Sequence, residues 1–472
     1  MLRFLCLLAA LVVCISANTP GEAKGLPGSV AKTLKKYKIP SSALSVVIQG
    51  VRSQSPRVRL NGATARNPAS TMKLVTSWAA LDALGPAHTF KTDIFALGPV
   101  KKGVLTGDLA IRGRGDPYLV LEELWKMLGE LRRLGIREIR GDLLIDNSLH
   151  SLEPNTPGAF DGGTHRLYNV IPTALTVNFN ATRFIFNAAG APKGQRITTV
   201  PGLPNLNIQD RLKRTRSRCN SRNIDVRMQV VDSTDVRFTG KLPAACVNYE
   251  LSRSTMDTAD YAFGAFKSTW AQWGGTITGA LKQGAVPAGR KPLMVWDSRP
   301  LAELLRPVNK WSNNVMARLL LYAVAAKRKP PPVSRADGAK AVAAHLKQRG
   351  LETSKLVIDN GSGLSRTARV SADFLNALLI KAWHEPHMPE FISSMSISGI
   401  DGTLRTRFRR GKERGRMHLK TGLLKNVISI SGYVLAASGR VYAVTMILNH
   451  GRARNGSGRA LQNAVLKWVH AQ

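Results

Sequence analysis

The chain has 472 residues, of which 44% are hydrophobic, and it contains 13 phenylalanines and 8 tryptophans. This composition excludes a disordered chain, and the length exceeds what one hydrophobic core usually organises, so we expect two or three domains. The formal net charge of +38 leaves two kinds of partner open, nucleic acid or an anionic envelope surface.

The N-terminal residues have the pattern of a secretory signal peptide. A short basic start precedes an apolar run from Phe4 to Ala17, which is too short to cross a bilayer comfortably. Cleavage after Ala17 or Ala23 fits this pattern, and a signal anchor is the alternative. We expect residues 1–23 to be a signal peptide and the protein to be exported to the periplasm or cell envelope. Export argues against nucleic acid as a partner.

The next residues predict a helix followed by a strand. Apolar residues at Leu26, Val30, Leu34 and Tyr37 recur with a helical period, and residues 43–48 have the composition of a strand.

Residues 67–81 predict a second helix, with Pro68 suited to its first turn and Gly85-Pro86 after its end. Ser70 and Lys73 lie three positions apart and therefore share one face of this helix. A lysine whose pKa is lowered by burial or by nearby positive charge can take the proton of a serine and make it a nucleophile. Taken alone, Ser-x-x-Lys also fits an ordinary surface helix.

Residues 89–294 are dominated by short strand-like runs with one clear helix, residues 119–134. Strands are predicted at 107–113 and 141–146, each entered through a Gly-Asp turn. The basic run 211–222 has no periodic apolar residues, which favours a solvated loop or strand edge over a specific anion site.

Cysteine use predicts one disulfide. Cys6 and Cys14 are removed with the signal peptide, which leaves Cys219 and Cys246 in an oxidising compartment. Two buried free thiols are the alternative. No Cys/His cluster has the spacing of a zinc site, and we expect neither a metal nor a cofactor.

Helical patterns return at 301–308 and 315–323, and a Pro- and Lys-rich linker at 327–332 precedes a helix at 336–349. The chain ends with predicted strands at 427–435 and 441–448 and a helix at 460–469.

Two short motifs in this C-terminal part change the interpretation of Ser70 and Lys73. Ser312-Asn313-Asn314 lies between helical patterns, and Lys420-Thr421-Gly422 stands just before the strand at 427–435. Each tripeptide is common by itself. The ordered set Ser-x-x-Lys, Ser-x-Asn and Lys-Thr-Gly is much rarer, and it is the signature of penicillin-binding proteins and serine β-lactamases.

The chemistry of amide hydrolysis gives each residue a role. Ser70 would attack, Lys73 would be the general base, and Ser312 would relay a proton to the leaving nitrogen. Asn314 would hold Lys73 and a substrate carbonyl, and Lys420 and Thr421 would bind the substrate carboxylate. Gly422 would let an extended substrate approach the strand. The backbone N–H groups of Ser70 and Leu423 would bind the oxyanion.

The chain resembles the D-alanyl-D-alanine carboxypeptidase/endopeptidase family, the class C low-molecular-mass penicillin-binding proteins. Besides the three motifs, the resemblance rests on Gly115-Asp116-Pro117, Tyr168-Asn169, residues 359–366, residues 401–404 and residues 420–434. It implies an α/β fold, with a β-lactamase-like transpeptidase domain formed from both chain ends, 24–88 and 295–472. It also implies that residues 89–294 form an inserted accessory region of two nested β-rich domains.

The resemblance implies an exported serine DD-peptidase that acts on peptidoglycan peptides, as a D-Ala-D-Ala carboxypeptidase, a D-Ala-meso-diaminopimelate endopeptidase or both. Penicillin and other β-lactams would acylate Ser70. One residue departs from the family pattern: Leu423 stands where a Ser or Thr usually helps to bind the terminal carboxylate. A catalytically weak peptidoglycan-binding protein of the same fold, and a β-lactamase or esterase, are therefore kept as alternatives.

Overall fold

Both ends of the chain contribute strands to one sheet of the computed structural model, which describes residues 25–151, 157–187 and 196–472. The signal peptide predicted for residues 1–23 lies outside the described residues. In spatial order the strands of this sheet are β18 (Ser396–Ile397), β19 (Met417–Leu424), β20 (Val427–Leu435), β21 (Val441–Asn449), β1 (Leu44–Gly50) and β2 (Val58–Leu60). β1 lies antiparallel to β21, so that a strand near the start of the chain is hydrogen-bonded to the last one.

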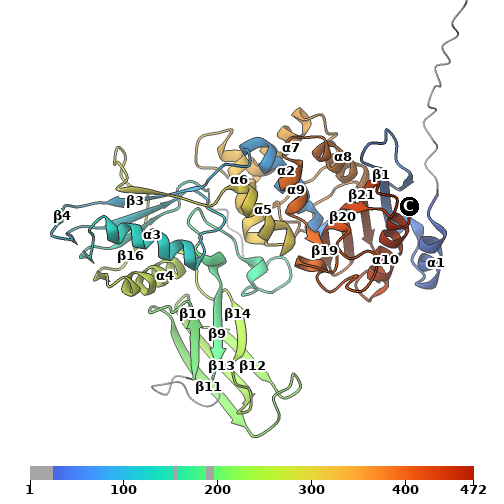
Figure 1. The fold of residues 1–472 in the computed structure, drawn as a ribbon. Coiled ribbons are helices and arrows are strands. Elements are labelled where there is room, and N and C mark those ends of the chain that lie inside the picture. The colour runs from blue at the N-terminus through green and yellow to red at the C-terminus, as the bar shows by residue number, and fades with distance from the viewer. Residues whose placement is uncertain (1–24, 152–156, 188–195) are drawn as a thin grey trace, which may run out of the picture.

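Helices cover both faces of this sheet (Figure 1). Successive side chains of a strand point to opposite faces, and β21 is buried on both: Ala443 and Ile447 join one core, whereas Val444 and Met446 join another. The first core contains α2 (Met72–Leu84), α5 (Leu301–Lys310), α6 (Asn314–Ala326), α7 (Arg335–Gln348), α8 (Ala372–Trp383) and α9 (Met388–Ser393). The second contains α1 (Gly28–Lys36) and α10 (Ser457–His470). The predicted elements that correspond to α1, β1, α2, α5, α6, α7, β20, β21 and α10 are confirmed, and α8 and α9 were not predicted.

A second lobe is built from the middle of the chain around its own core. One sheet has the order β16 (Leu281–Gln283), β8 (Leu143–Asp146), β6 (Leu109–Gly113), β3 (Lys91–Ala96) and β17 (Met294–Asp297). A smaller one has the order β15 (Thr276–Ile277), β7 (Glu138–Ile139), β5 (Val104–Leu105) and β4 (Val100–Lys101). The two strands expected after Gly-Asp turns are confirmed as β6 and β8, which pair in parallel.

Two helices, α3 (Leu121–Arg133) and α4 (Thr258–Gln272), pack in this second core. α3 confirms the predicted helix, whereas α4 contradicts the expectation of only one clear helix in this region. The cause is burial: the buried residues of α4 include Tyr261, Phe263 and Phe266 and occur nearly all around the helix, so no polar face marks its period. The remaining signal is Asp257, whose side chain caps the first turn.

A small β-structure extends away from both lobes (Figure 1). Its sheets have the orders β10 (Ile197–Val200), β9 (Thr182–Phe186), β14 (Tyr249–Arg253) and β11 (Asn207–Thr215), β13 (Asp235–Pro243), β12 (Asp225–Val230). Phe184, Phe186 and Phe238 pack edge to face between them. The basic run 211–222 begins in β11 at the edge of its sheet and continues into a turn, as expected for a strand edge and a solvated loop.

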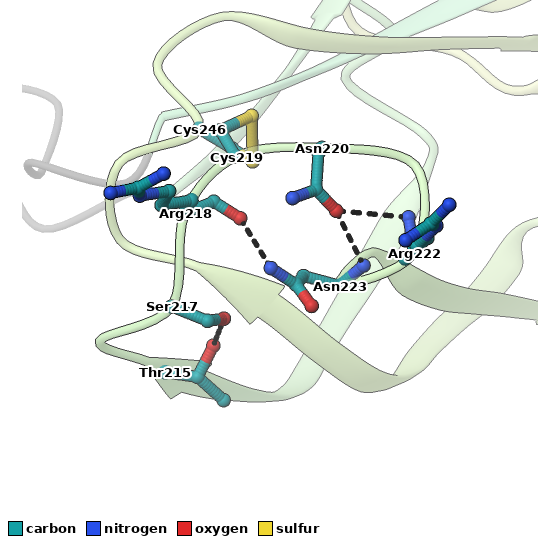
Figure 2. Close-up of a disulfide and its surroundings, with 8 residues drawn as sticks. All are labelled: Thr215, Ser217, Arg218, Cys219, Asn220, Arg222, Asn223 and Cys246. Atoms are coloured by element: carbon teal, nitrogen blue, oxygen red, sulfur yellow. Dashed lines mark hydrogen bonds between the residues drawn. A yellow bond between two sulfur atoms is a disulfide. The ribbon is translucent and has the colours of Figure 1, made fainter.

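The predicted disulfide is present in this small β-structure. Cys219 and Cys246 are bonded, and their Cα atoms lie 5.0 Å apart. Cys219 belongs to a turn stabilised by Asn220 and Asn223, while Cys246 is buried in the aromatic core (Figure 2). The bond therefore ties an exposed turn to the core beside it.

The predicted domain boundaries stay a prediction: a catalytic domain of 24–88 with 295–472, and an insertion at 89–294. β17 belongs to the sheet of the second lobe and extends to Asp297, three residues past the predicted end of the insertion. Among the helices of the described residues, none combines the length and the apolar character needed to span a bilayer.

Breaking the disulfide should destabilise the small β-structure without affecting Ser70. A bond closing a loop of 27 positions contributes about 3–4 kcal/mol in the chain-entropy treatment. We expect the Cys219→Ala/Cys246→Ala variant to show faster hydrogen exchange in β11–β14 and unchanged exchange in β19–β21. The disulfide assignment would be contradicted if both cysteines of protein prepared under oxidising conditions reacted with a thiol reagent.

Candidate active site

The turn before α2 fixes Ser70 at the start of that helix. Asn67 Oδ1 accepts a hydrogen bond from Ala69 N at 2.9 Å, and Asn67 Nδ2 donates to Ser365 O at 2.8 Å. Ala69 has a positive φ of 48°, a strained backbone for a non-glycine residue. The short helix Ala69–Thr71 then leads directly into α2. Ser70 is therefore held by the backbone on both sides rather than by a flexible loop.

Lys73 lies one turn further along and is fully buried. Its Nζ donates to Ser70 Oγ at 3.2 Å, to Asn314 Oδ1 at 2.6 Å and to Ser362 O at 2.6 Å. Burial lowers the pKa of Lys73 well below its usual value, and the positive charges of Lys420 and Arg318 lower it further. These causes favour the neutral amine, which is the form that can accept a proton from Ser70.

Ser312 and Asn314 are presented by the start of α6. Asn313 caps this helix with its side chain, and Ser312 has a positive φ of 60°. Asn314 is the first helical residue, and its Nδ2 donates to Tyr168 O at 2.9 Å. That bond orients the amide so that Oδ1 faces Lys73.

Lys420 is a second fully buried lysine, on β19. Its Nζ donates to Ser312 Oγ at 2.9 Å and to Thr421 O at 2.7 Å. Burial lowers the pKa of Lys420 to about 7. The Lys-Thr-Gly motif precedes the predicted strand at 427–435, as expected, and itself lies within another strand, β19.

Gly422 allows β19 to touch the turn that carries Ser70. A Cβ at position 422 would lie 2.2 Å from Ser429 Oγ, 2.8 Å from Pro68 O and 2.9 Å from Ser70 N. Any side chain there would push the Ser70 turn away from the sheet. The sequence suggested that Gly422 accommodates the substrate, and the structure adds this second requirement.

Thr421 and Leu423 lie on the accessible side of the same strand. Thr421 Oγ1 donates to Thr403 Oγ1 at 2.8 Å, and the Leu423 side chain is 50% exposed. An apolar side chain therefore borders the open end of the candidate site.

The structure brings the predicted residues into two hydrogen-bonded groups. Ser70, Lys73 and Asn314 form one, Ser312 and Lys420 form the other, and Thr421, Gly422 and Leu423 continue along β19. Sequence reasoning missed the carbonyls of Ser362 and Tyr168, because a backbone acceptor leaves no residue-type signal. It also gave no role to Thr403, although residues 359–366, 168–169 and 401–404 had all contributed to the resemblance.

The chain is similar to known proteins in both sequence and fold. A family model described as the D-Ala-D-Ala carboxypeptidase 3 (S13) family matches residues 26–472. The chain is 30% identical over 416 residues to a D-alanyl-D-alanine carboxypeptidase of Actinomadura sp. (strain R39), covering 84% of this chain and 76% of that protein. It is 27% identical over 398 residues to the D-alanyl-D-alanine carboxypeptidase DacB of Haemophilus influenzae, covering 82% and 81% of the two chains.

The crystal structure of penicillin binding protein 4 from Haemophilus influenzae has the same fold. The TM-score is 0.77 at 24% identity, and the match covers 94% of this chain and 99% of that one. This likeness confirms the predicted α/β fold of the penicillin-binding-protein type. With the family model matched from residue 26 to the last residue, the chain belongs to the D-Ala-D-Ala carboxypeptidase 3 (S13) family.

Proposed function

We propose that the protein is a serine DD-peptidase that hydrolyses D-alanyl bonds in peptidoglycan peptides through an acyl-enzyme on Ser70. The observation that carries the proposal is the buried Lys73 amine, whose pKa is lowered and whose Nζ lies 3.2 Å from Ser70 Oγ. A neutral amine at this distance can take the serine proton as Oγ attacks the carbonyl carbon. Membership of the S13 family supports the same reaction.

The remaining residues fit the two halves of the reaction. When the C–N bond breaks, the leaving nitrogen takes a proton through Ser312 Oγ, which is hydrogen-bonded to Lys420 Nζ. The backbone N–H groups of Ser70 and Leu423 are the oxyanion donors, and β19 lies against the Ser70 turn as this role requires. Water then cleaves the ester and regenerates Ser70.

Carboxylate recognition falls to Lys420 and Thr421. The Lys420 ammonium supplies the charge and the Thr421 hydroxyl a hydrogen bond, while Leu423 places apolar surface where a hydroxyl would give another. The free carboxylate of a terminal D-alanine is therefore held by fewer donors. This favours cleavage of cross-linked peptides over removal of a terminal D-alanine, and it also supports the alternative of a catalytically weak peptidoglycan-binding protein.

β-Lactams enter the same site, because their strained amide presents a carbonyl to Ser70 and a carboxylate to Lys420. A peptidoglycan substrate supports a location in the periplasm or at the cell envelope, and the N-terminal signal pattern supports the same location. The net charge of +38 supports contact with an anionic envelope surface.

Penicillin should label Ser70 and no other residue. We expect no labelling of Ser70→Ala by a fluorescent penicillin, and labelling of Lys73→Ala slowed by about 10²–10⁴-fold, as expected for loss of a general base. Ser77→Ala, which removes a buried serine from the same helix, is the control and should label normally. Labelling of Ser70→Ala at the wild-type level would refute the assignment.

Acylation should depend on pH in a bell-shaped manner. Protonated Lys73 cannot act as a base, so the rate rises with pH through the lowered pKa of Lys73. Deprotonated Lys420 cannot bind a carboxylate, so the rate falls above the Lys420 pKa of about 7.

Lys420→Arg should remove the falling limb of this pH profile, because a guanidinium stays charged. Lys420→Ala should move the rising limb to higher pH, because Lys73 loses a positive neighbour. Profiles of the benzylpenicillin acylation rate that are identical in all three proteins would contradict these roles.

Restoring a hydroxyl at position 423 should favour terminal D-alanine. A hydrogen bond to a charged group is worth about 1.5–3 kcal/mol. We expect Leu423→Thr to raise kcat/KM for a D-alanyl-D-alanine pentapeptide more than it raises the penicillin acylation rate. Leu424→Thr, at the next position of β19, is the control. Equal changes in the two rates, or a drop in peptide turnover alone, would show that Leu423 does not limit carboxylate recognition.

A further inference from the structure

A basic hollow of about 960 Å³ lies in the loop between β18 and β19. Its lining combines Gly399, Ile400 and Thr406 with four arginines, Arg405, Arg409, Arg410 and Arg414. We call it the arginine hollow. All four arginines are exposed, so their guanidinium groups are free to meet a ligand from solution.

Within the described part of the chain, none of these four arginines forms an ion pair. The nearby carboxylates do not supply one: Asp401 is paired with Lys310 at 2.5 Å, and Glu413 is half-buried within the loop itself and is not part of the lining. Four like charges that line one hollow make it electropositive, and an anion bound there would reduce their mutual repulsion. Guanidinium groups bind carboxylates and phosphates through paired N–H donors, so the lining is suited to an oxyanion.

The arginine hollow begins beside the candidate active site. Thr421 Oγ1, on β19, donates to Thr403 Oγ1, and Arg405 follows two positions after Thr403. Thr403 belongs to the short helix Gly402–Leu404, which directly precedes Arg405. This helix is held in place by two hydrogen bonds, from Gly399 N to Leu404 O and from Thr403 N to Ser396 Oγ. The hollow therefore begins two residues from Thr403, the hydrogen-bond partner of Thr421.

This position decides which part of a substrate can reach the arginines. In the proposed function Lys420 and Thr421 receive the carboxylate of the group that leaves, so the hollow neighbours the leaving side of the site. A single D-alanine ends at Lys420 and Thr421 and has nothing to extend beyond them. When a cross-link is cut, the leaving group is a whole peptide with further carboxylates, and those can extend past Thr403.

We propose that the arginine hollow binds carboxylates of the leaving peptide chain and thereby selects cross-linked peptides over terminal D-alanine. The proposal rests on the proposed function and deepens it, because it gives the site a specificity determinant outside the three motifs. It also compensates for Leu423: binding energy lost at the first carboxylate is supplied at more distant ones. The alternative ligand of the hollow is an anionic polymer of the envelope. Such a polymer would respond to the net charge of the loop and not to the position of each arginine, so the experiment can distinguish it from the leaving peptide.

The test compares two double variants that each remove two positive charges from the same loop. Arg409→Gln/Arg410→Gln changes residues that line the hollow, whereas Lys412→Gln/Arg416→Gln changes exposed residues that do not. For each protein, kcat/KM is measured on a cross-linked muropeptide dimer and on a D-alanyl-D-alanine pentapeptide, together with the benzylpenicillin acylation rate. We expect the first variant to lose about tenfold on the dimer alone, as for partly exposed charge-assisted contacts. The second variant should match wild type on all three.

Each other outcome overturns the proposal. Equal losses on the dimer in both variants would show attraction to net charge, as expected for an anionic polymer. If the first variant lost kcat/KM equally on the dimer and on the pentapeptide, the substitutions would be acting on Ser70 or Lys420 and not on the leaving peptide. A dimer rate unaffected by the arginines, or no dimer cleavage by wild type, would also refute it. The proposed function fails separately, if wild type is not acylated by penicillin and cleaves neither peptide.

Discussion

The candidate active site depends on a lysine side chain that is buried without an anion beside it. In the described chain the acceptors of Lys73 Nζ are a hydroxyl, an amide oxygen and a backbone carbonyl, none of which carries a full charge. Burying an unpaired charge is costly, so the lysine is stabilised as a neutral amine. Three segments far apart in sequence must converge to satisfy it, at α2, at the start of α6 and at Ser362. If one of them moves, a buried polar group loses its partner, so the structure of the site is coupled to the protonation of Lys73.

Lys420 is the second buried lysine of the candidate site, and its Nζ donates to Ser312 Oγ. Both lysines are fully buried, which lowers the pKa of each, and the positive charge of Lys420 lowers the pKa of Lys73 further. Gly422 lets β19, the strand that carries Lys420, contact the turn that carries Ser70. The position of a strand, set by the sheet, thus determines an electrostatic property of a helix residue.

The sequence predicts the fold class, most helices and strands of the two chain ends and the residues of the three motifs. These features can be recognised from residue type, from hydrophobic period or from the order of motifs along the chain. Sequence reasoning missed α4, whose burial nearly all around erases the amphipathic period, and it gave the carbonyls of Ser362 and Tyr168 no part. Backbone acceptors can be supplied by any residue, so the sequence does not mark them. The packing of Gly422 against Pro68 and Ser70 was likewise inaccessible, because it joins two segments whose distance is known only once the sheet is formed.

The pairing of β1 with β21 has a consequence for how the protein matures. A strand near the beginning of the chain has no partner on that side until the last strands have been synthesised, so the main sheet closes late and through contacts of very large sequence separation. The middle of the chain has cores of its own and can fold while the C-terminal strands are still absent. Lys73 then lacks Asn314, Ser362 and Lys420, and its amine remains an ordinary solvated cation. The surroundings that lower the pKa of Lys73 therefore form only when the C-terminal half of the chain has folded against α2.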